Sequence, residues 1–310
     1  MSGGERTEER PGDSVIRVVR EQFGLSLNDV IEGWAGEESV GWRVPSPGGD
    51  RFVQRFPRWR RAEELGWCDE VAAAAATQDP ACVHAVPTDD GRRAIETSDG
   101  PVMVFPFVDG DHPDDHVVIA AEAARLLARI HRGIAAAWTG KRVRASTQPP
   151  SIGRGELDPR LRDRELDLWE RSIEATEPPL PIHGDYYAGN LFVKGMLVIG
   201  VIDWSDARLE HHEQEVAWAM WEFCQNDDGD DLVESDAEAF LQAYIDTGGP
   251  ASVAPPFDAF PWIRQRLRWE AAAWFSDPRS TAEVSAYHEA QVRAFHAIRN
   301  RRLRGRPGNQ

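Results

Sequence analysis

The segment from Leu180 to Trp204 holds three oxygen-bearing side chains in a fixed order around a short apolar run. Asp185 follows a His-Gly pair, Asn190 lies five residues later, and Asp203 follows the run Leu197 to Ile202. A short apolar run bounded by turn residues indicates a buried strand. We therefore expect Asp185 and Asn190 on one loop and Asp203 at the end of the next strand, and the fold must bring these two places together.

Kinase-type phosphoryl transfer uses such a set of oxygen donors. One Asp accepts the proton of the substrate hydroxyl, while an Asn and a second Asp hold the magnesium ions that bridge the phosphates. We predict Asp185 as the catalytic carboxylate, and Asn190 and Asp203 as Mg²⁺ ligands, because Mg²⁺ prefers carboxylate, amide and phosphate oxygens. His-Gly-Asp alone is also a reasonable turn sequence, but three residues in register favour the catalytic interpretation.

A strand-rich first third precedes a helix-rich remainder, and a chain of 310 residues suits two lobes. Apolar periodicity predicts helices over 14–24, 61–77, 119–134, 158–175, 213–225, 236–247, 261–275 and 281–302, and strands over 40–44, 51–56, 92–97 and 101–107. We expect an α+β architecture with a β-rich N-lobe over 14–107, a mostly helical C-lobe over 108–302, and flexible tails at 1–13 and 303–310.

Charge and composition restrict the partners and the compartment. A formal net charge of −17 argues against nucleic acid or an anionic membrane as a partner and fits a cationic or neutral small ligand. The first fourteen residues lack the apolar segment of a signal peptide, and no apolar run approaches the roughly 18 residues of a membrane span. Three cysteines without CxxC spacing indicate reduced thiols. We expect a cytoplasmic monomer or homodimer.

The sequence resembles the aminoglycoside phosphotransferase and choline-kinase-like family of small-molecule kinases, which share the bilobal protein-kinase-like fold. The strongest match is HGDxxxxN followed by IDW, in which the three positions discussed above agree in identity, order and spacing. Weaker matches cover the nucleotide loop, the strand that bears the family's cation, the segment after the hinge, and the helix behind the catalytic loop, at residues 36–39, 52–55, 107–110 and 127–131.

The resemblance implies the phosphate-binding residues. Arg55 stands where the family carries Lys or Arg, and a guanidinium can bind the α- and β-phosphates through its planar fork. A carboxylate from the next helix would pair with Arg55; Glu70 is the candidate, with Glu63 and Glu64 as rivals. Ser39 would contact the phosphates through its hydroxyl or amide group.

The nucleobase is expected at the hinge, residues 105–108. Pro106 offers only a carbonyl there, while Val108 keeps its N–H, so one acceptor and one donor remain for the base. ATP is the expected phosphoryl donor, and the sequence leaves GTP open. Glu37 and Glu38 are acidic for a phosphate-facing loop and are expected to point to solvent or toward a cationic acceptor.

Several other polar residues are given structural roles. His183 is interpreted as a histidine that fixes the catalytic loop and His131 as a satisfied core histidine near that loop, while Glu215 matches an acidic position that braces the family's catalytic core. The HExxH zinc pattern fails because Val216 stands where the second His belongs. The run from Asn226 to Asp231 lacks the length and terminal Glu of an EF-hand, so we interpret it as an acidic surface loop.

The function predicted from these residues is transfer of the γ-phosphoryl group of ATP, with Mg²⁺, to a hydroxyl of a small molecule. The candidate acceptors are an aminoglycoside or another antibiotic, which would give resistance by inactivation, or a metabolite such as a sugar, nucleoside or amino alcohol. A protein kinase would need an APE-like segment that the sequence lacks. A pseudokinase binding module would not need Asp185, Asn190 and Asp203 together, and a metallohydrolase would need further His ligands.

Overall fold

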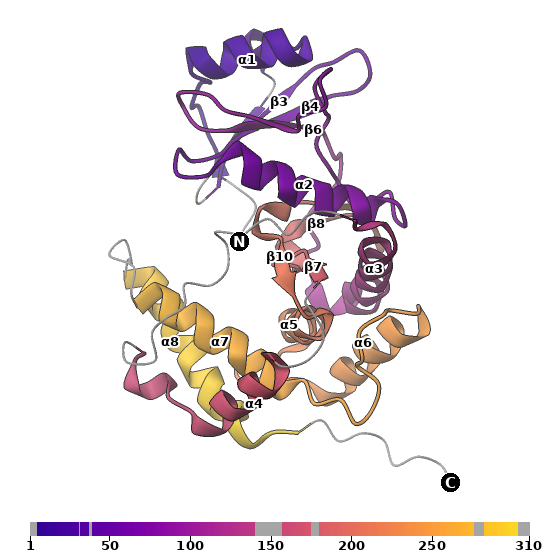
Figure 1. The fold of residues 1–310 in the computed structure, drawn as a ribbon, viewed down its shortest axis with the longest axis vertical. Helices are drawn as coiled ribbons and strands as arrows, with labels where there is room; N and C mark the ends of the chain where they lie inside the picture. The colour runs from indigo at the N-terminus through magenta and orange to yellow at the C-terminus, as the bar shows by residue number, and fades with distance from the viewer. Residues whose placement is uncertain are drawn as a thin grey trace.

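The computed structural model describes residues 5–30, 32–36, 39–139, 157–174, 180–275 and 282–302. Glu37, Glu38 and the expected tail at 303–310 lie outside the described residues. Figure 1 shows a sheet-containing N-terminal part above a larger helical part, with α2 between the sheet and the C-terminal part. The α+β architecture predicted from the sequence is confirmed.

The N-terminal sheet has six antiparallel strands. Their order is β1-β2-β3-β4-β6-β5, with β1 (Glu5–Arg6), β2 (Glu32–Ala35), β3 (Val40–Val44), β4 (Arg51–Arg55), β5 (Ala94–Ile95) and β6 (Val102–Pro106). The predicted strands 40–44 and 51–56 are found as β3 and β4, which pair as a hairpin with Val40 opposite Arg55 and Val44 opposite Arg51. The expected flexible tail at 1–13 is wrong for its described part, because Glu5 and Arg6 pair with β2 and extend the sheet.

Alternation along the strands gives the sheet two different faces. Val53 packs in one apolar cluster with Val15 and Val19 of α1 (Asp13–Phe23), so α1 covers this face. Met103 and Phe56 pack with Leu65 of α2 (Ala62–Ala76) on the opposite face. Successive side chains of a strand point to opposite faces, so each position of β4 faces either α1 or the space between the two lobes.

The C-terminal part buries the larger core. It is formed mainly by helices: α3 (His116–Ala137), α4 (Arg164–Glu174), α5 (His212–Cys224), α6 (Glu234–Asp246), α7 (Phe260–Phe275) and α8 (Ala282–Ala297). The Asp115 carboxylate caps α3 by accepting hydrogen bonds from the backbone N–H groups of Val117 and Val118. Two short antiparallel pairs, β7 (Leu180–Ile182) with β10 (Arg208–Glu210) and β8 (Leu191–Lys194) with β9 (Leu197–Val201), lie where the two parts meet.

Most predicted helices are confirmed with small changes at their ends. The exception is the helix expected over 158–175, which begins only at Arg164. Asp158 instead caps a separate short turn, Pro159–Leu161, by accepting from the N–H of Arg160. Cys68, Cys82 and Cys224 are buried and free, as expected for reduced thiols. Within the described parts of the chain, no helix is long and apolar enough to cross a membrane.

Candidate active site

The catalytic loop leaves β7 through a glycine that tertiary packing requires. Gly184 has φ +90°, and a Cβ atom there would lie 2.1 Å from the carbonyl oxygen of Asp206. Only glycine adopts this conformation without strain. The close approach brings the loop that carries Asp185 against the segment that follows Asp203.

Asn190 ties together the two ends of this site. Its Nδ2 group donates to the backbone oxygen of Asp185 at 2.8 Å and to Asp185 Oδ2 at 3.0 Å. The backbone carbonyl of Asn190 accepts from the N–H of Ile202 at 3.0 Å, and this bond fixes the residue before Asp203. Asp185, Asn190 and Asp203 therefore meet at one place, as the spacing predicts.

Asp203 has an unusual backbone conformation. Its φ is +59°, and in the described part of the chain no other residue besides glycine has a positive φ. Such residues cost about 1–3 kcal/mol and persist where the surroundings hold them. Ser205 Oγ donates to Asp203 Oδ1 at 2.7 Å and fixes the carboxylate orientation. Asp203 lies where β9 ends and the short turn Trp204–Asp206 begins, and it lines a cleft together with Gln54 and Ser205.

These side chains fit a magnesium ion. Because Asn190 uses Nδ2 toward Asp185, its Oδ1 remains as a neutral oxygen ligand, and Asp203 supplies an anionic one. The described residues contain no group of three or more His, Cys, Asp or Glu side chains arranged around a metal. Mg²⁺ in phosphoryl-transfer sites takes one or two protein ligands and completes its shell with phosphate and water, so a pair of oxygen ligands is sufficient.

His183 is neutral and holds the catalytic loop through hydrogen bonds of both ring nitrogens. Its Nε2–H donates to the Ile202 carbonyl at 2.9 Å, and its Nδ1 accepts from the Asp185 N–H at 3.3 Å, a tautomer assigned from these partners. Burial lowers the pKa of His183. A neutral imidazole with both nitrogens engaged has no free site for substrate protons, which supports the structural role expected for this residue.

Glu215 braces the same loop from α5. Its carboxylate accepts from the N–H of Gly184 at 2.6 Å, from the N–H of His183 at 3.2 Å, and from His131 Nε2 at 2.8 Å. Burial opposes ionisation, but the hydrogen bond and charge of His131 outweigh it and lower the pKa of Glu215 to about 2. The bracing role assigned to Glu215 by resemblance thus has a direct geometric basis: one buried carboxylate binds two consecutive loop amides.

The surroundings of Asp185 raise the pKa of its carboxyl group. Burial and then the nearby carboxylate of Asp206 raise the pKa of Asp185 to about 7; the Arg266 guanidinium opposes this shift, and Asp203 adds to it. A general base is most effective when its pKa lies near the working pH. Asp185 therefore has the environment of a catalytic base, beyond its place in the motif.

This environment predicts a pH dependence. Because only the ionised carboxylate accepts a proton, kcat/KM should fall as the pH drops through about 7. In Asp206→Asn, loss of the neighbouring negative charge should lower the pKa of Asp185 and move this limb to lower pH. Steady-state rates measured between about pH 5 and 9 test both points. An unchanged limb in Asp206→Asn would contradict the charge coupling.

The structure corrects the prediction for Arg55. Arg55 lies on the α1 side of the sheet, where it pairs with Glu9 at 2.8 Å and donates to the Asp99 carbonyl at 3.5 Å. The neighbouring Gln54 points into the cleft and lines it together with Asp203. Side chains two positions apart on a strand point to the same face, so Arg55 lies on the same face as the buried Val53, which packs against α1. The resemblance to the family did not reveal this orientation.

Glu70, the carboxylate predicted to pair with Arg55, does not line the cleft either. Glu70 and Glu63 are exposed on α2, whereas Glu64 is buried. The α2 acid that lines the cleft is Asp69, which sequence reasoning missed. Asp69 pairs with Arg93 at 2.7 Å, so this carboxylate is already neutralised from the back of the cleft.

Of the remaining residues expected on the nucleotide side, Ser39 directly precedes β3, Pro106 ends β6 and Val108 follows that strand. Ser39 Oγ accepts from Gln54 Nε2 at 2.9 Å and so lies beside the cleft. Phe107 donates its N–H to the Asp50 carbonyl, which puts Pro106 at a non-hydrogen-bonded position of the β4–β6 ladder where its missing N–H costs nothing. Among the described residues, the Pro106 carbonyl and the Val108 N–H have no backbone partner, which leaves both groups open to a nucleobase.

A second acidic group faces Asp185 from the helices. Glu222 of α5 and Glu270 of α7 interact electrostatically with each other, and both act on Asp185. Burial, then Glu270, raises the pKa of Glu222 to about 8. Arg266 pairs with Glu270 at 2.6 Å and leaves one guanidinium nitrogen unpartnered. Sequence reasoning missed these residues, although a carboxylate within an apolar helix segment such as WEFC was an available signal.

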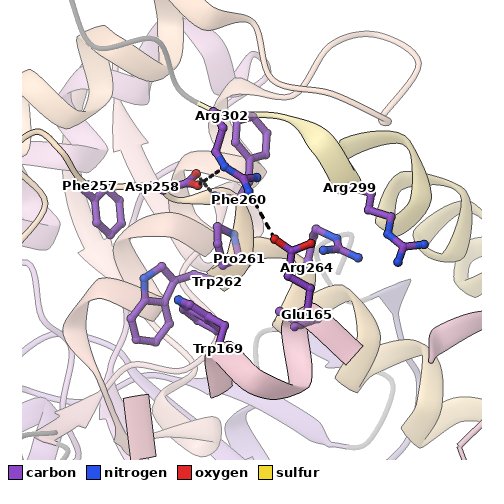
Figure 2. A pocket seen from close by; sticks show the side chains of 11 residues that line it. Glu165, Trp169, Phe257, Asp258, Phe260, Pro261, Trp262, Arg264, Arg299 and Arg302 are labelled. Carbon is purple, nitrogen blue, oxygen red and sulfur yellow. Dashed lines mark hydrogen bonds and ion pairs between the residues drawn. The ribbon is translucent and has the colours of Figure 1, made fainter. Parts of the chain in front are cut away.

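A separate cavity of about 340 Å³ lies between α4, α7 and the C-terminal residues. Trp169 and Trp262 form one wall in an edge-to-face contact, and Figure 2 shows Arg302 pointing toward Asp258 and Glu165. None of the predicted site residues lines this cavity, and Arg302 already has carboxylate partners. It is distinct from the catalytic cluster.

Two lobes, with a buried carboxyl group on the loop after β7 and two oxygen-bearing side chains near it, are the arrangement of a kinase-like phosphotransferase. The chain belongs to the phosphotransferase enzyme family, whose sequence profile matches residues 30–256. The comparison with curated proteins gave no match.

Solved structures share the protein-kinase-like fold over nearly the whole chain. The microcompartment-associated aminopropanol kinase has a TM-score of 0.67 and 16% identity, covering 92% of this chain and 95% of that chain. Spectinomycin phosphotransferase APH(9)-Ia, in complex with ADP and spectinomycin, has a TM-score of 0.59 and 12% identity, covering 94% and 99%. A thermostable mutant of aminoglycoside phosphotransferase APH(4)-Ia has a TM-score of 0.60 and 18% identity, covering 92% and 98%. At these identities the likeness shows the fold.

Proposed function

We propose that this chain transfers the γ-phosphoryl group of ATP, with Mg²⁺, to a hydroxyl of a small molecule that also carries an amine. The observation that carries the proposal is the meeting of Asp185, Asn190 and Asp203, joined by hydrogen bonds through Asn190 and Ile202. Of the related structures, one contains ADP, which supports an adenine nucleotide as donor.

The roles follow from the contacts. Asp185 orients the acceptor hydroxyl and takes its proton as the new bond to phosphorus forms, and Asn190 holds this carboxylate in place. Asn190 Oδ1 and Asp203 would hold Mg²⁺, which when bound neutralises charge on the phosphates. His183 and Glu215 keep the loop fixed during transfer. For the base, the Pro106 carbonyl and Val108 N–H supply an acceptor and a donor.

The carboxyl groups of Glu222 and Glu270, which interact electrostatically with Asp185, support an amine-bearing acceptor. Glu222 and Glu270 supply two carboxyl groups against one guanidinium, Arg266, so an ammonium group would balance the charge of Glu222 in its ionised form. Aminopropanol, the substrate named for one related kinase, combines an amine and a hydroxyl. An aminoglycoside, which would make the role antibiotic resistance, and a smaller amino alcohol both meet this requirement.

An acceptor screen tests the proposal. The protein is incubated with ATP, Mg²⁺ and aminoglycosides, amino alcohols, sugars and nucleosides, and products are examined by mass spectrometry for a gain of about 80 Da, one phosphoryl group. We expect product only among amine-bearing alcohols and none without divalent metal. Turnover restricted to neutral sugars or nucleosides would overturn the amine assignment, and nucleotide binding with no turnover for any acceptor would favour a binding module.

Glu222→Gln separates acceptor binding from catalysis. Loss of this carboxylate should raise KM for an amine-bearing acceptor by about tenfold, the value of one charge-assisted hydrogen bond, while KM for ATP stays unchanged. Because the pKa of Glu222 is about 8, acceptor affinity in the wild type should also increase as the pH rises toward that value. Glu234→Gln, an exposed change on α6, is the matched control. An unchanged acceptor KM would remove Glu222 from the site.

A further inference from the structure

Arg60 is a buried cation without a counter-charge. It lies in the turn between β4 and α2 and is only 6% exposed. Its Nη2 group donates to the Ser205 carbonyl, and its Nε atom is buried with no hydrogen-bond partner. Among the described residues, no carboxylate lies within ion-pair distance of Arg60. Burying an unpaired charge is costly unless a partner is present in the working state.

The other buried arginines show that this arrangement is specific to Arg60. The arginines of α7 are all paired with carboxylates, namely Arg264, Arg266 and Arg268. Arg208 has no carboxylate partner among the residues that the structure describes, but it donates to the Gly184 carbonyl at 2.8 Å and to Gln214 at 3.5 Å. Arg60 combines the absence of a carboxylate with an unsatisfied donor, so its guanidinium has unused capacity to bind an anion.

Arg60 lies beside the nucleotide cleft. Ser205, whose carbonyl it contacts, lines the cleft together with Asp203 and Cys68. The Cys68 thiol donates to the same Ser205 carbonyl at 3.6 Å, and Arg60 acts electrostatically on Cys68. The guanidinium thus contacts Ser205, which lies two positions after the predicted metal ligand Asp203 in the chain.

The cleft lacks the usual strand cation. Phosphoryl-transfer enzymes of this architecture place a basic side chain on the strand that corresponds to β4. Here the cleft-facing side chain is Gln54, while Arg55 points to the other face and pairs with Glu9. The cleft acid of α2, Asp69, is occupied by Arg93 and does not compete for Arg60.

We propose that Arg60 is the residue that binds the nucleotide phosphates, supplying from the start of α2 the positive charge that β4 does not present. This inference rests on the proposed function, since it takes a nucleotide polyphosphate as the anion. Arg60 has one donor on Ser205 and further N–H groups for phosphate oxygens. Binding would also connect α2 to the Asp203 loop through the same side chain.

Titration calorimetry with two ligands tests this role, with ADP as the phosphate-bearing ligand and adenosine as the ligand without phosphate. In Arg60→Ala, ADP affinity should fall at least about tenfold, as expected for loss of a charge-assisted contact, while adenosine affinity stays unchanged. Arg60→Lys should retain part of the ADP affinity, and Arg55→Ala all of it. Adding Gln54→Lys to Arg60→Ala should recover ADP affinity, because the new cation faces the cleft.

Two results would overturn the proposal. ADP affinity equal to that of the wild type in Arg60→Ala would show that Arg60 does not bind phosphate. An equal loss for adenosine and ADP would show that Arg60 only holds the fold, and the same would follow if Arg60→Lys, with an unchanged melting temperature, bound ADP no better than Arg60→Ala. A wild-type protein that binds neither ligand would instead overturn the proposed function, since the assay requires no turnover.

Discussion

Asp185→Asn should lower kcat by about a thousandfold while nucleotide affinity changes little. The amide has the same shape and can still accept the hydrogen bond of Asn190 Nδ2, so the loop keeps its geometry. It cannot take the proton of the acceptor hydroxyl, and general-base catalysis contributes about 10²–10⁴-fold to rate. Steady-state kinetics with a phosphorylated acceptor and calorimetry with ADP measure the two quantities separately.

Asp228→Asn is the matched control for this prediction. Asp228 lies exposed in the acidic loop after α5, so the same chemical change there should leave kcat unaltered.

Asp185→Asn should also be more stable than the wild type at neutral pH. The folded pKa of Asp185 is raised to about 7, so the ionised carboxylate destabilises the fold progressively as the pH rises from about 4 to 7. An active Asp185→Asn enzyme would contradict the general-base assignment.

Glu215→Ala should lower the free energy of unfolding by about 3–5 kcal/mol, the usual cost of removing one partner from a buried charged network. The substitution leaves the N–H groups of His183 and Gly184 and the Nε2 atom of His131 without their acceptor. Activity should be lost together with stability, because the catalytic loop loses its brace. Urea unfolding at neutral pH, followed by fluorescence, measures the effect.

Glu213→Ala controls for the loss of a carboxylate from α5. Glu213 is partly exposed and accepts one hydrogen bond, from the N–H of Ser252 at 2.7 Å, so its removal should cost about 1 kcal/mol or less. Since the pKa of Glu215 is lowered from 4.5 to about 2, its stabilising contribution should be complete above the first value and be lost progressively as the pH falls to the second. Equal unfolding midpoints for the two variants would refute the bracing role.

The catalytic cluster could be predicted from the sequence because its geometry is largely local. Asp185 and Asn190 share one loop, and the short hairpin of β8 and β9 returns the chain to the same place before Asp203. A hairpin of this length has few alternative pairings, so spacing along the chain fixes proximity in space. The helices were likewise predicted from apolar periodicity, with errors confined mainly to their ends.

The phosphate-binding side could not be predicted in the same way. The resemblance to the family placed Arg55 in the cleft, but a shift of one residue along a strand moves a side chain to the opposite face. The pairing of Val40 with Arg55, and the packing of Val53 against α1, fix the orientation of β4 and turn Gln54 inward. These contacts join segments far apart in the chain.

The sequence alone determined the lobed α+β architecture and the identities of Asp185, Asn190 and Asp203, since both depend on short-range periodicity and spacing. Only the tertiary structure decided which charges face the cleft: Gln54 instead of Arg55, Asp69 instead of Glu70, and the buried Arg60 beside Ser205. The physical reason is that the direction of a side chain depends on which distant surface its strand or helix buries, and burial is a property of the whole fold.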